Sequence, residues 1–273
     1  MIYYKDQYTQ KQTYTNLVKF ETAQFLVYFD QVQNEAINIP FSPFGGIVQK
    51  NNYSLKDLQT FLNQLKEQLK HSGINKIILQ QPPHFYNDFI TSDELISLGF
   101  TSQKPDINQY VPLDNIIYHV MEKRLLRKKH SFTIEKSTNF SLGHQFISDC
   151  RQQQGLTINI TRNKLLALVE QNTAAYNLYL VKEERELACA VITVDPNPDV
   201  RYYYLPATHN SFKNLSPMVY ALDKIYMDAK IEGFQYLDLG RSSIDGFSQK
   251  GLFNFKKNMG AQESVLHTFE MIL

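Results

Sequence analysis

The sequence is poor in several residues and patterns that mark whole classes of protein. Trp is absent, and Cys150 and Cys189 are the two cysteines among 273 residues, which excludes a disulfide framework and a cysteine-based metal site. Cys189 lies in an apolar run at residues 187–192, so a buried, unreactive thiol is expected. No apolar run approaches the roughly 18 residues of a membrane span, and the first residues lack the apolar core of a signal peptide. We therefore predict a cytoplasmic protein with no membrane span and no metal.

An excess of charge of one sign is also lacking. Lys and Arg number 28 against 27 Asp and Glu, a net charge of +1, so there is no general attraction to nucleic acid or to an anionic membrane. The chain is rich in apolar and aromatic residues, with 43% hydrophobic residues, 17 Tyr and 18 Phe. This is enough for a large core and aromatic cleft walls, in one large domain or in two of ordinary size.

The stretch at residues 234–261 carries the clearest local pattern. Its first part alternates, with Asp238 and Tyr236 on one face, which predicts a strand that Gly240 ends. A polar loop and an amphipathic helix follow, and Gly260 stops that helix. The strand therefore delivers an acid and two serines to its carboxyl end, where the ligands of open α/β sheets tend to bind.

The order of elements in this stretch occurs twice in the chain. Each half is expected to have a helix, a glycine, a strand at residues 76–80 or 236–239, a short helix, a second glycine and a final strand. The first-half helix is expected to begin at Ser54, with Asp57 completing a capping box, and the second at Ser216. The expected apolar stripe of the first helix is Leu55, Leu58, Leu62, Leu65 and Leu69. Coincidence is the alternative to duplication, since such units are common in α/β proteins.

The predicted fold class is α/β (α+β), with two tandem halves that each contain a mixed, mostly antiparallel sheet flanked by helices. Residues 1–120 form the first half, truncated at its front, and residues 121–273 form the complete second half. The second half adds two helices and an antiparallel set of strands. These are expected at residues 139–154 and 161–171, and at 177–182, 186–194 and 201–205.

Two short motifs resemble a known superfamily. Asp238-Leu239-Gly240 and the run from Gly251 to Lys257 resemble the strand, loop and Gly-Leu/Ile-x-x-Phe-Lys helix of GCN5-related N-acyltransferases (GNAT, acyl-CoA N-acyltransferases). The tandem Fem-type (FemAB-like) branch is most similar. The resemblance implies direct attack of an amine on an acyl donor, which is acyl-CoA in most members and aminoacyl-tRNA in the Fem-type branch. It also implies tandem copies of the fold.

By this resemblance, the donor would enter a wedge between the strands at residues 202–205 and 236–239. Asp238 is then the candidate base or amine-orienting group, and Ser242 and Ser243 would hydrogen-bond the acyl carbonyl or the leaving group. The alternative is that Asp238 is a structural acid that bonds neighbouring loop amides. A Tyr usually protonates the leaving thiolate in this superfamily, but no Tyr follows residue 236, so Ser242 would have to substitute.

The loop at residues 209–216 precedes a helix N-terminus, which favours anions. The superfamily's Gly-rich pyrophosphate loop is missing, because no Gly lies between Tyr202 and Glu232. Side-chain donors would have to bind CoA instead. The candidates are His209, Ser211, Lys213, Asn214 and Ser216. The alternative is an ordinary polar loop before a capped helix.

Four further residues are candidates for binding substrate: Tyr204, Tyr236, Arg241 and Lys256. Arg241 suits a carboxylate or phosphate. Lys256 matches the Fem-type Phe-Lys position, although a surface lysine is the alternative. A basic run from Lys123 to Lys129 suits a tRNA backbone or, alternatively, a solvated helix end.

Three functions follow from these features. The first is an N-acyltransferase that moves an acyl or aminoacyl group from an activated donor, most simply acyl-CoA, to an amine by direct attack. The second is a degenerate tandem fold that binds a ligand without turnover, favoured by the missing Gly-rich loop and Tyr. The third is a Fem-type peptidyltransferase that uses aminoacyl-tRNA on a cell-wall precursor, against which the modest charge argues.

Overall fold

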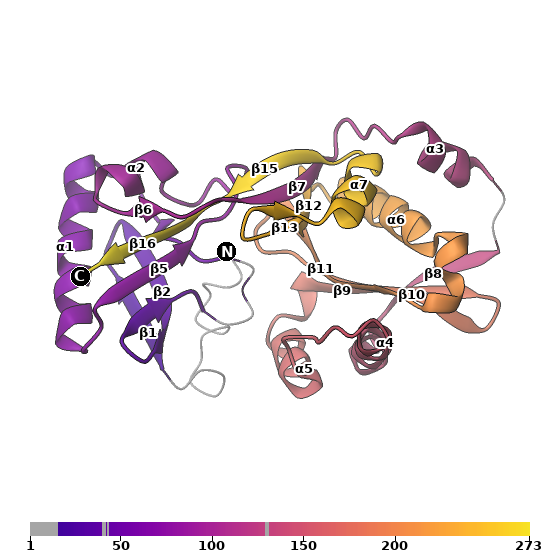
Figure 1. The fold of residues 1–273 in the computed structure, drawn as a ribbon, viewed down its shortest axis with the longest axis horizontal. Coiled ribbons are helices and arrows are strands. Elements are labelled where there is room, and N and C mark those ends of the chain that lie inside the picture. The colour runs from indigo at the N-terminus through magenta and orange to yellow at the C-terminus, as the bar shows by residue number, and fades with distance from the viewer. Residues whose placement is uncertain (1–15, 40–41, 43, 129–130) are drawn as a thin grey trace.

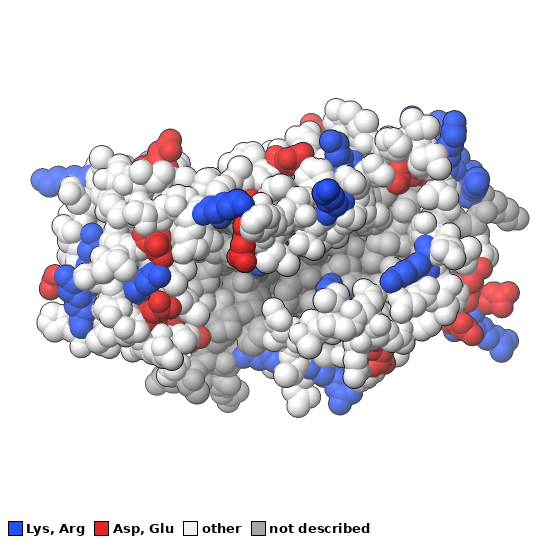
Figure 2. All heavy atoms as spheres, in the orientation of Figure 1, with Lys and Arg blue, Asp and Glu red and all other residues white. Residues whose placement is uncertain are grey.

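Two β-sheets lie end to end in an elongated molecule, each with helices packed against it (Figure 1). The computed structural model describes residues 16–39, 42, 44–128 and 131–273. In this part of the chain, no helix combines the length and apolar character needed to cross a membrane. Figure 2 shows basic and acidic side chains interspersed over one face, as the small net charge implies.

The first sheet is built mainly from the N-terminal half of the chain. Its strands, in spatial order, are β1 (Leu17–Glu21), β2 (Phe25–Val32), β3 (Glu35–Ile37), β5 (Lys76–Gln80), β16 (Thr268–Ile272) and β6 (Thr101–Ser102), and β4 (Val48–Gln49) pairs with β2. Helix α1 (Leu55–His71) packs on this sheet, and α2 (Ser92–Ser97) follows β5.

The second sheet has helices on both faces. Its strands, in spatial order, are β15 (Gln262–Leu266), β7 (Asp106–Pro112), β12 (Tyr236–Arg241), β11 (Val200–Thr208), β10 (Glu186–Val194), β9 (Tyr176–Glu183) and β8 (Phe132–Ser137). Helices α4 (Phe140–Gln152) and α5 (Arg162–Gln171) share one apolar core with one face. Helix α6 (Pro217–Ile231) packs on the other face, near α3 (Val120–Arg127) and α7 (Lys250–Asn258). A small hairpin of β13 (Ser243–Ile244) and β14 (Phe247–Ser248) follows β12.

The two sheets exchange one strand each. Strand β7 of the first half lies between β12 and β15, and β16 of the second half lies at the same place between β5 and β6. Strands β5 and β12 therefore hold corresponding positions, each next to one parallel neighbour, β3 or β11. The predicted fold class, two halves with mixed, mostly antiparallel sheets flanked by helices, is confirmed. Because of the exchange, a division of the chain after residue 120 separates two sequence halves but not the two sheets.

Local sequence explains how α1 begins and which of its faces is buried. The Ser54 side chain accepts the Asp57 amide, and the Asp57 carboxylate accepts the Ser54 amide, which is the predicted capping box. Leu58, Leu62, Leu65 and Leu69 are buried as predicted, together with Phe61. Leu55 is wrongly placed in the predicted stripe: it is the first residue of the helix and is 55% exposed.

The helix that follows residue 216 begins differently from α1. Ser216 stands at the N-cap of α6, but its backbone is left-handed, with φ of 54°, and its side chain makes no capping hydrogen bond. A capping side chain needs an extended backbone at this position to reach the helix amides. The Ser216 side chain therefore does not cap α6, although the Ser216 carbonyl accepts the Val219 amide at 3.0 Å.

Candidate functional site

Strands β11 and β12 separate at their carboxyl ends. They pair in parallel only from Val200 with Tyr236 to Tyr202 with Asp238, although β11 continues to Thr208. On its other edge β11 pairs with β10, and the register shifts so that Tyr204 is an extra, bulged residue. The strands separate at the place of the wedge expected between residues 202–205 and 236–239. Residues of both strand ends line a cavity there.

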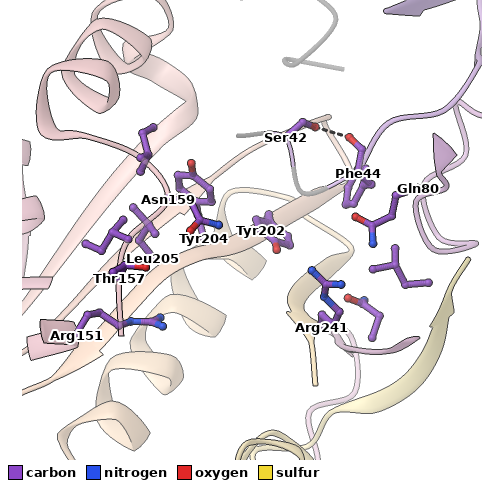
Figure 3. Close-up of a pocket in the computed structure, with 14 residues that line it drawn as sticks. Ser42, Phe44, Gln80, Arg151, Thr157, Asn159, Tyr202, Tyr204, Leu205 and Arg241 are labelled. Carbon is purple, nitrogen blue, oxygen red and sulfur yellow. Dashed lines mark hydrogen bonds between the residues drawn. The ribbon is translucent and has the colours of Figure 1, made fainter. Parts of the chain in front are cut away.

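That cavity, called here the inter-half cavity, has a volume of about 520 Å³. Its walls come from the end of β11, from the segment after α4, from β7 and β12, and from the first half. The lining residues include Tyr202, Tyr204, Leu205, Arg151, Asn159, Asn108, Arg241, Gln80, Phe44 and Leu266. Figure 3 shows Arg151 at one end and Arg241 at the other, with Tyr202 and Tyr204 between them. The described lining residues include no Asp, Glu or His.

Asp238 lies behind this cavity and is fully buried. Its Oδ1 accepts hydrogen bonds from Asn108 Nδ2 at 2.9 Å and from the Gly240 amide at 2.8 Å, and its Oδ2 accepts one from Tyr86 Oη at 2.8 Å. Burial raises the pKa of the Asp238 carboxyl, and these hydrogen bonds act in the opposite direction. Asp238 therefore reaches the cavity through Asn108 and does not line it itself.

The two serines after Asp238 are directed toward β7. Ser242 Oγ donates to Gln109 Oε1 at 2.6 Å, and Ser243 Oγ donates to Asp106 Oδ1 at 2.6 Å and accepts the Ile107 amide. Both side chains are buried, and neither lines the inter-half cavity. Their partners are on a strand far away in the sequence, so the sequence alone carried no signal of this arrangement.

The structure brings two of the four predicted substrate-binding residues to the inter-half cavity. Tyr204 and Arg241 line it, and Arg241 Nη1 also pairs with Asp106 Oδ2 at 2.9 Å. Tyr236 instead lines a separate hollow beside Phe234 and packs edge-on against Tyr110.

Lys256 is not on the surface. It is 3% exposed, and its ammonium donates to Gly240 O at 2.8 Å and to Arg241 O at 2.9 Å. Burial lowers the pKa of Lys256 to about 8. The side chain thus holds the end of β12 rather than lining a cavity.

A second cavity, the α6 cavity, opens at the N-terminus of α6 and has a volume of about 570 Å³. Lys213 and Ser216, two of the five predicted donor-binding residues, line it. His209, Ser211 and Asn214 do not, and the His209 ring accepts the Ser211 amide within its own loop. The rest of the wall is mainly apolar. It includes Leu125, Leu156, Tyr203, Pro206, Met218, Leu252 and Phe255.

The two cavities lie on opposite faces of β11. Tyr202 and Tyr204 line the inter-half cavity, and Tyr203 between them lines the α6 cavity, as strand alternation requires. Arg151 lines both cavities, and its Nη2 donates to Pro206 O at 3.1 Å. Arg151 could not be predicted from the sequence, since it lies in the last turn of α4 and belongs to no motif.

Gly240 and Tyr202 meet at the point where the strands separate. A side chain on Gly240 would place its Cβ 2.9 Å from Tyr202 Oη, and the backbone there is left-handed, with φ of 75°. Both facts require glycine. Burial raises the pKa of the Tyr202 hydroxyl far above its ordinary range, so this hydroxyl remains protonated.

The corresponding place in the first half is filled. Strands β3 and β5 pair at Glu35–Lys76 and Ala36–Ile77. Beyond that point, Asn38 Oδ1 accepts the Gln80 amide at 3.0 Å and the Gly45 amide donates to Gln80 O at 2.8 Å. These bonds close the gap that stays open between β11 and β12, so the second half holds the candidate site.

No protein-family model matches the sequence, and no curated protein matches it. Solved structures do match. FemX superposes with a TM-score of 0.70 and 14% identity, covering 98% of this chain and 91% of that one. L-PGS from Bacillus licheniformis gives 0.64 and 13%, covering 93% and 83%. A tandem GNAT protein from the clavulanic acid biosynthesis pathway gives 0.57 and 7%, covering 91% and 78%.

These likenesses show a GNAT-like fold in two halves, with the Fem-type branch among the structures it resembles. The resemblance read from Asp238-Leu239-Gly240 and from the run at residues 251–257 is thereby confirmed as a likeness of fold. At such low identities, the donor and the acceptor have to be argued from this chain's own residues.

Proposed function

We propose that this protein is an N-acyltransferase that joins an activated acyl group to an amine where β11 and β12 separate. The observation that carries the proposal is the pair of cavities on the two faces of β11, which meet at Arg151. One cavity would hold the donor and the other the acceptor, so that the two reacting groups approach from opposite sides. The likeness to FemX and to a tandem GNAT protein supports this class of reaction.

The α6 cavity suits an acyl-CoA donor. The N-terminus of α6 carries partial positive charge, and the wall holds two cations, Lys213 and Arg151, against one carboxylate, Glu122, so an anionic phosphate group would be favoured there. The apolar wall suits the pantetheine and acyl parts of the molecule. In this proposal, Lys213 and Ser216 take over from the Gly-rich loop that the chain lacks.

The reaction balances without a further reactant. The amine nitrogen attacks the thioester carbonyl carbon, the C–N bond forms, the C–S bond breaks, and the proton lost by the amine is matched by the proton gained by the thiolate. Tyr202 Oη lies at the separation of the strands, beside Gly240, so it is placed to hydrogen-bond the leaving sulfur. Asp238 would act as a positioning residue that holds the Asn108 amide at the cavity.

The inter-half cavity suits an amine that also carries a negative charge. Arg151 and Arg241 line it, and no carboxylate is among its described lining residues. Arg241 already has Asp106 as a partner, whereas Arg151 forms no ion pair within the described residues. A carboxylate or phosphate on the acceptor would therefore bind at Arg151.

Two measurements test this function. CoA, acetyl-CoA and longer acyl-CoAs should raise the melting temperature of the protein, and a panel of amines should then release free thiol from the thioester. Lys213→Ala should weaken CoA binding about three- to tenfold, and Lys224→Ala, on the outer face of α6, should not. If none of these donors stabilises the wild-type protein, an acyl-CoA donor is ruled out.

Binding without turnover is the second candidate function. It is favoured by the burial of Asp238, Ser242 and Ser243, whose polar atoms are all bonded within the protein. This candidate predicts stabilisation by a donor with no thiol release from any amine. The same pair of measurements therefore separates the two functions.

The position of helix α3 beside the α6 cavity favours an aminoacyl-tRNA donor. Glu122 and Leu125 of α3 line the α6 cavity, so the exposed cations Lys123, Arg124, Arg127 and Lys128 lie beside the proposed donor site. Lys129, which completes this run in the sequence, lies outside the described residues. Replacing acyl-CoA by aminoacyl-tRNA in the transfer assay, at low and high salt, tests this donor.

A further inference from the structure

A third cavity, called here the β15 groove, runs along an open strand edge. It has a volume of about 500 Å³ and is lined by three consecutive residues of β15, Glu263, Ser264 and Val265. Successive side chains of a strand point to opposite faces. A cavity that touches all three therefore follows the edge of β15 rather than either face.

The edge of β15 that borders the groove has no strand beside it in the described structure. Strand β7 occupies one edge of β15, and the sheet order ends at β15 on the other. No backbone hydrogen bond outside the sheet involves residues 262–266 within the described chain. Exposed edges are often protected by Pro or by charged side chains, Lys above all; the Gln-Glu-Ser-Val-Leu sequence of β15 has neither Lys nor Pro, and Glu263 is its one charged residue.

The opposite wall of the groove comes from the loop between β5 and α2. Pro82 and Phe89 line it with little exposed area, whereas Val265 on the β15 side is 47% exposed. Tyr86 also lines the groove, and its hydroxyl is bonded to Asp238. The groove therefore offers a backbone edge with the exposed Val265 side chain on it, and an added strand uses such an edge together with side-chain contacts.

The charges around the groove have one sign. Asp93 lies on the α2 side and Glu263 on the β15 side, and no Lys or Arg is among the described lining residues. His84 and His267 also line it, and burial lowers the pKa of His267, which keeps that ring neutral. A segment with positive charge is complementary to this surface.

We propose that the β15 groove binds an extended, Lys- or Arg-bearing segment of a partner polypeptide, which adds to β15 as a further strand. Its backbone would pair with the free edge of β15. Its apolar side chains would contact Val265 and Phe89, and its cations would face Asp93 and Glu263. This interaction surface is separate from the two cavities assigned to acyl transfer and does not depend on that function.

The test uses the full chain and fluorescence anisotropy. The probe is a fluorescein-labelled peptide, Lys-Val-Lys-Val-Lys-Val, and two control peptides accompany it. One replaces every Lys by Glu, and the other keeps the charges but carries methyl groups on all internal backbone nitrogens. We expect the first peptide to bind with a Kd below about 1 mM and neither control peptide to bind.

Two charge-reversal variants test whether the peptide binds at β15. Glu263→Lys should weaken binding of the basic peptide about tenfold, because an attraction becomes a repulsion. Glu135→Lys, on the strand at the opposite edge of the same sheet, is the matched control and should leave binding unchanged. The proposal is overturned by absence of binding, by equal binding of the methylated peptide, or by a loss of binding in Glu135→Lys rather than in Glu263→Lys.

Discussion

The hydroxyl of Tyr86 donates a 2.8 Å hydrogen bond to Oδ2 of Asp238, across 152 residues of sequence. Tyr86 belongs to the loop after β5 in the first half, and Asp238 belongs to β12 in the second. Both residues are buried, and Asp238 also holds Asn108 of the exchanged strand β7. One carboxylate thus ties together three segments that meet at the join of the halves.

A double-mutant cycle should measure the energetic coupling between Tyr86 and Asp238. Because the bond is buried and its acceptor is a carboxylate, we expect Tyr86→Phe and Asp238→Asn to show a coupling of about 1–3 kcal/mol in the free energy of unfolding. Urea denaturation of the wild type, both single variants and the double variant provides the value. As a control, Tyr53→Phe removes a hydroxyl bonded to Glu94 within the first half. Its effect should add to that of Asp238→Asn within about 0.5 kcal/mol.

The role of Asp238 in turnover can be measured on the same variant. We expect Asp238→Asn to lower the turnover of the folded fraction less than tenfold, because the carboxylate is enclosed by three donors and does not line the cavity. A positioned base contributes roughly 100- to 10,000-fold. A loss of that size at an unchanged melting temperature would contradict the positioning role and identify Asp238 as the base.

Much of the fold could be predicted because it depends on local pattern. The capping box at Ser54, the strand that ends at Gly240 and the order of helix, glycine and strand in both halves are short-range features. The exchange of β7 and β16 could not be predicted, since either strand would suit either sheet by its sequence. Which sheet a strand joins is decided by packing that involves the whole chain.

The site was harder to predict than the fold for the same reason. The sequence places Asp238, Ser242 and Ser243 together at a strand end, but the partners that occupy them come from β7 and from Tyr86. Arg151 carries no motif, and its importance comes only from lying at the meeting point of two cavities. By its sequence, Lys256 resembles a surface lysine. In the structure its ammonium donates to the carbonyls of Gly240 and Arg241 at the end of β12, which no local pattern indicates.

Arg151 should control the affinity for the acceptor. If an anionic amine binds there, Arg151→Gln should raise its KM about 10- to 100-fold, because a charge-assisted hydrogen bond is lost, with a smaller change in kcat. The KM for the neutral amide of the same amine should change little. Arg185→Gln removes an exposed charge from the turn between β9 and β10 and serves as the control. Equal effects of Arg151→Gln on the charged and neutral amines would contradict anion recognition.

Lys256 should give the protein a stability that rises with pH in alkaline solution. Its pKa is about 8 in the folded protein, against 10.5 for the ordinary side chain, because burial disfavours the ammonium ion. Between these values the unfolded chain binds more protons than the folded one, so the free energy of unfolding increases with pH, by at most about 1.4 kcal/mol per unit. Below pH 8 both states are protonated and the contribution is constant.

Lys256→Met should remove this slope. The variant also loses the two hydrogen bonds to Gly240 O and Arg241 O, which lowers its stability at every pH, so the slope and not the offset is the informative quantity. We expect the stability difference between wild type and Lys256→Met to widen from pH 8 to 10.5 in urea denaturation. Lys257→Met, at the exposed neighbouring position, should follow the wild-type curve. A constant difference across this range would mean that Lys256 titrates as it does in the unfolded chain, and that its burial has little energetic effect on the charged form.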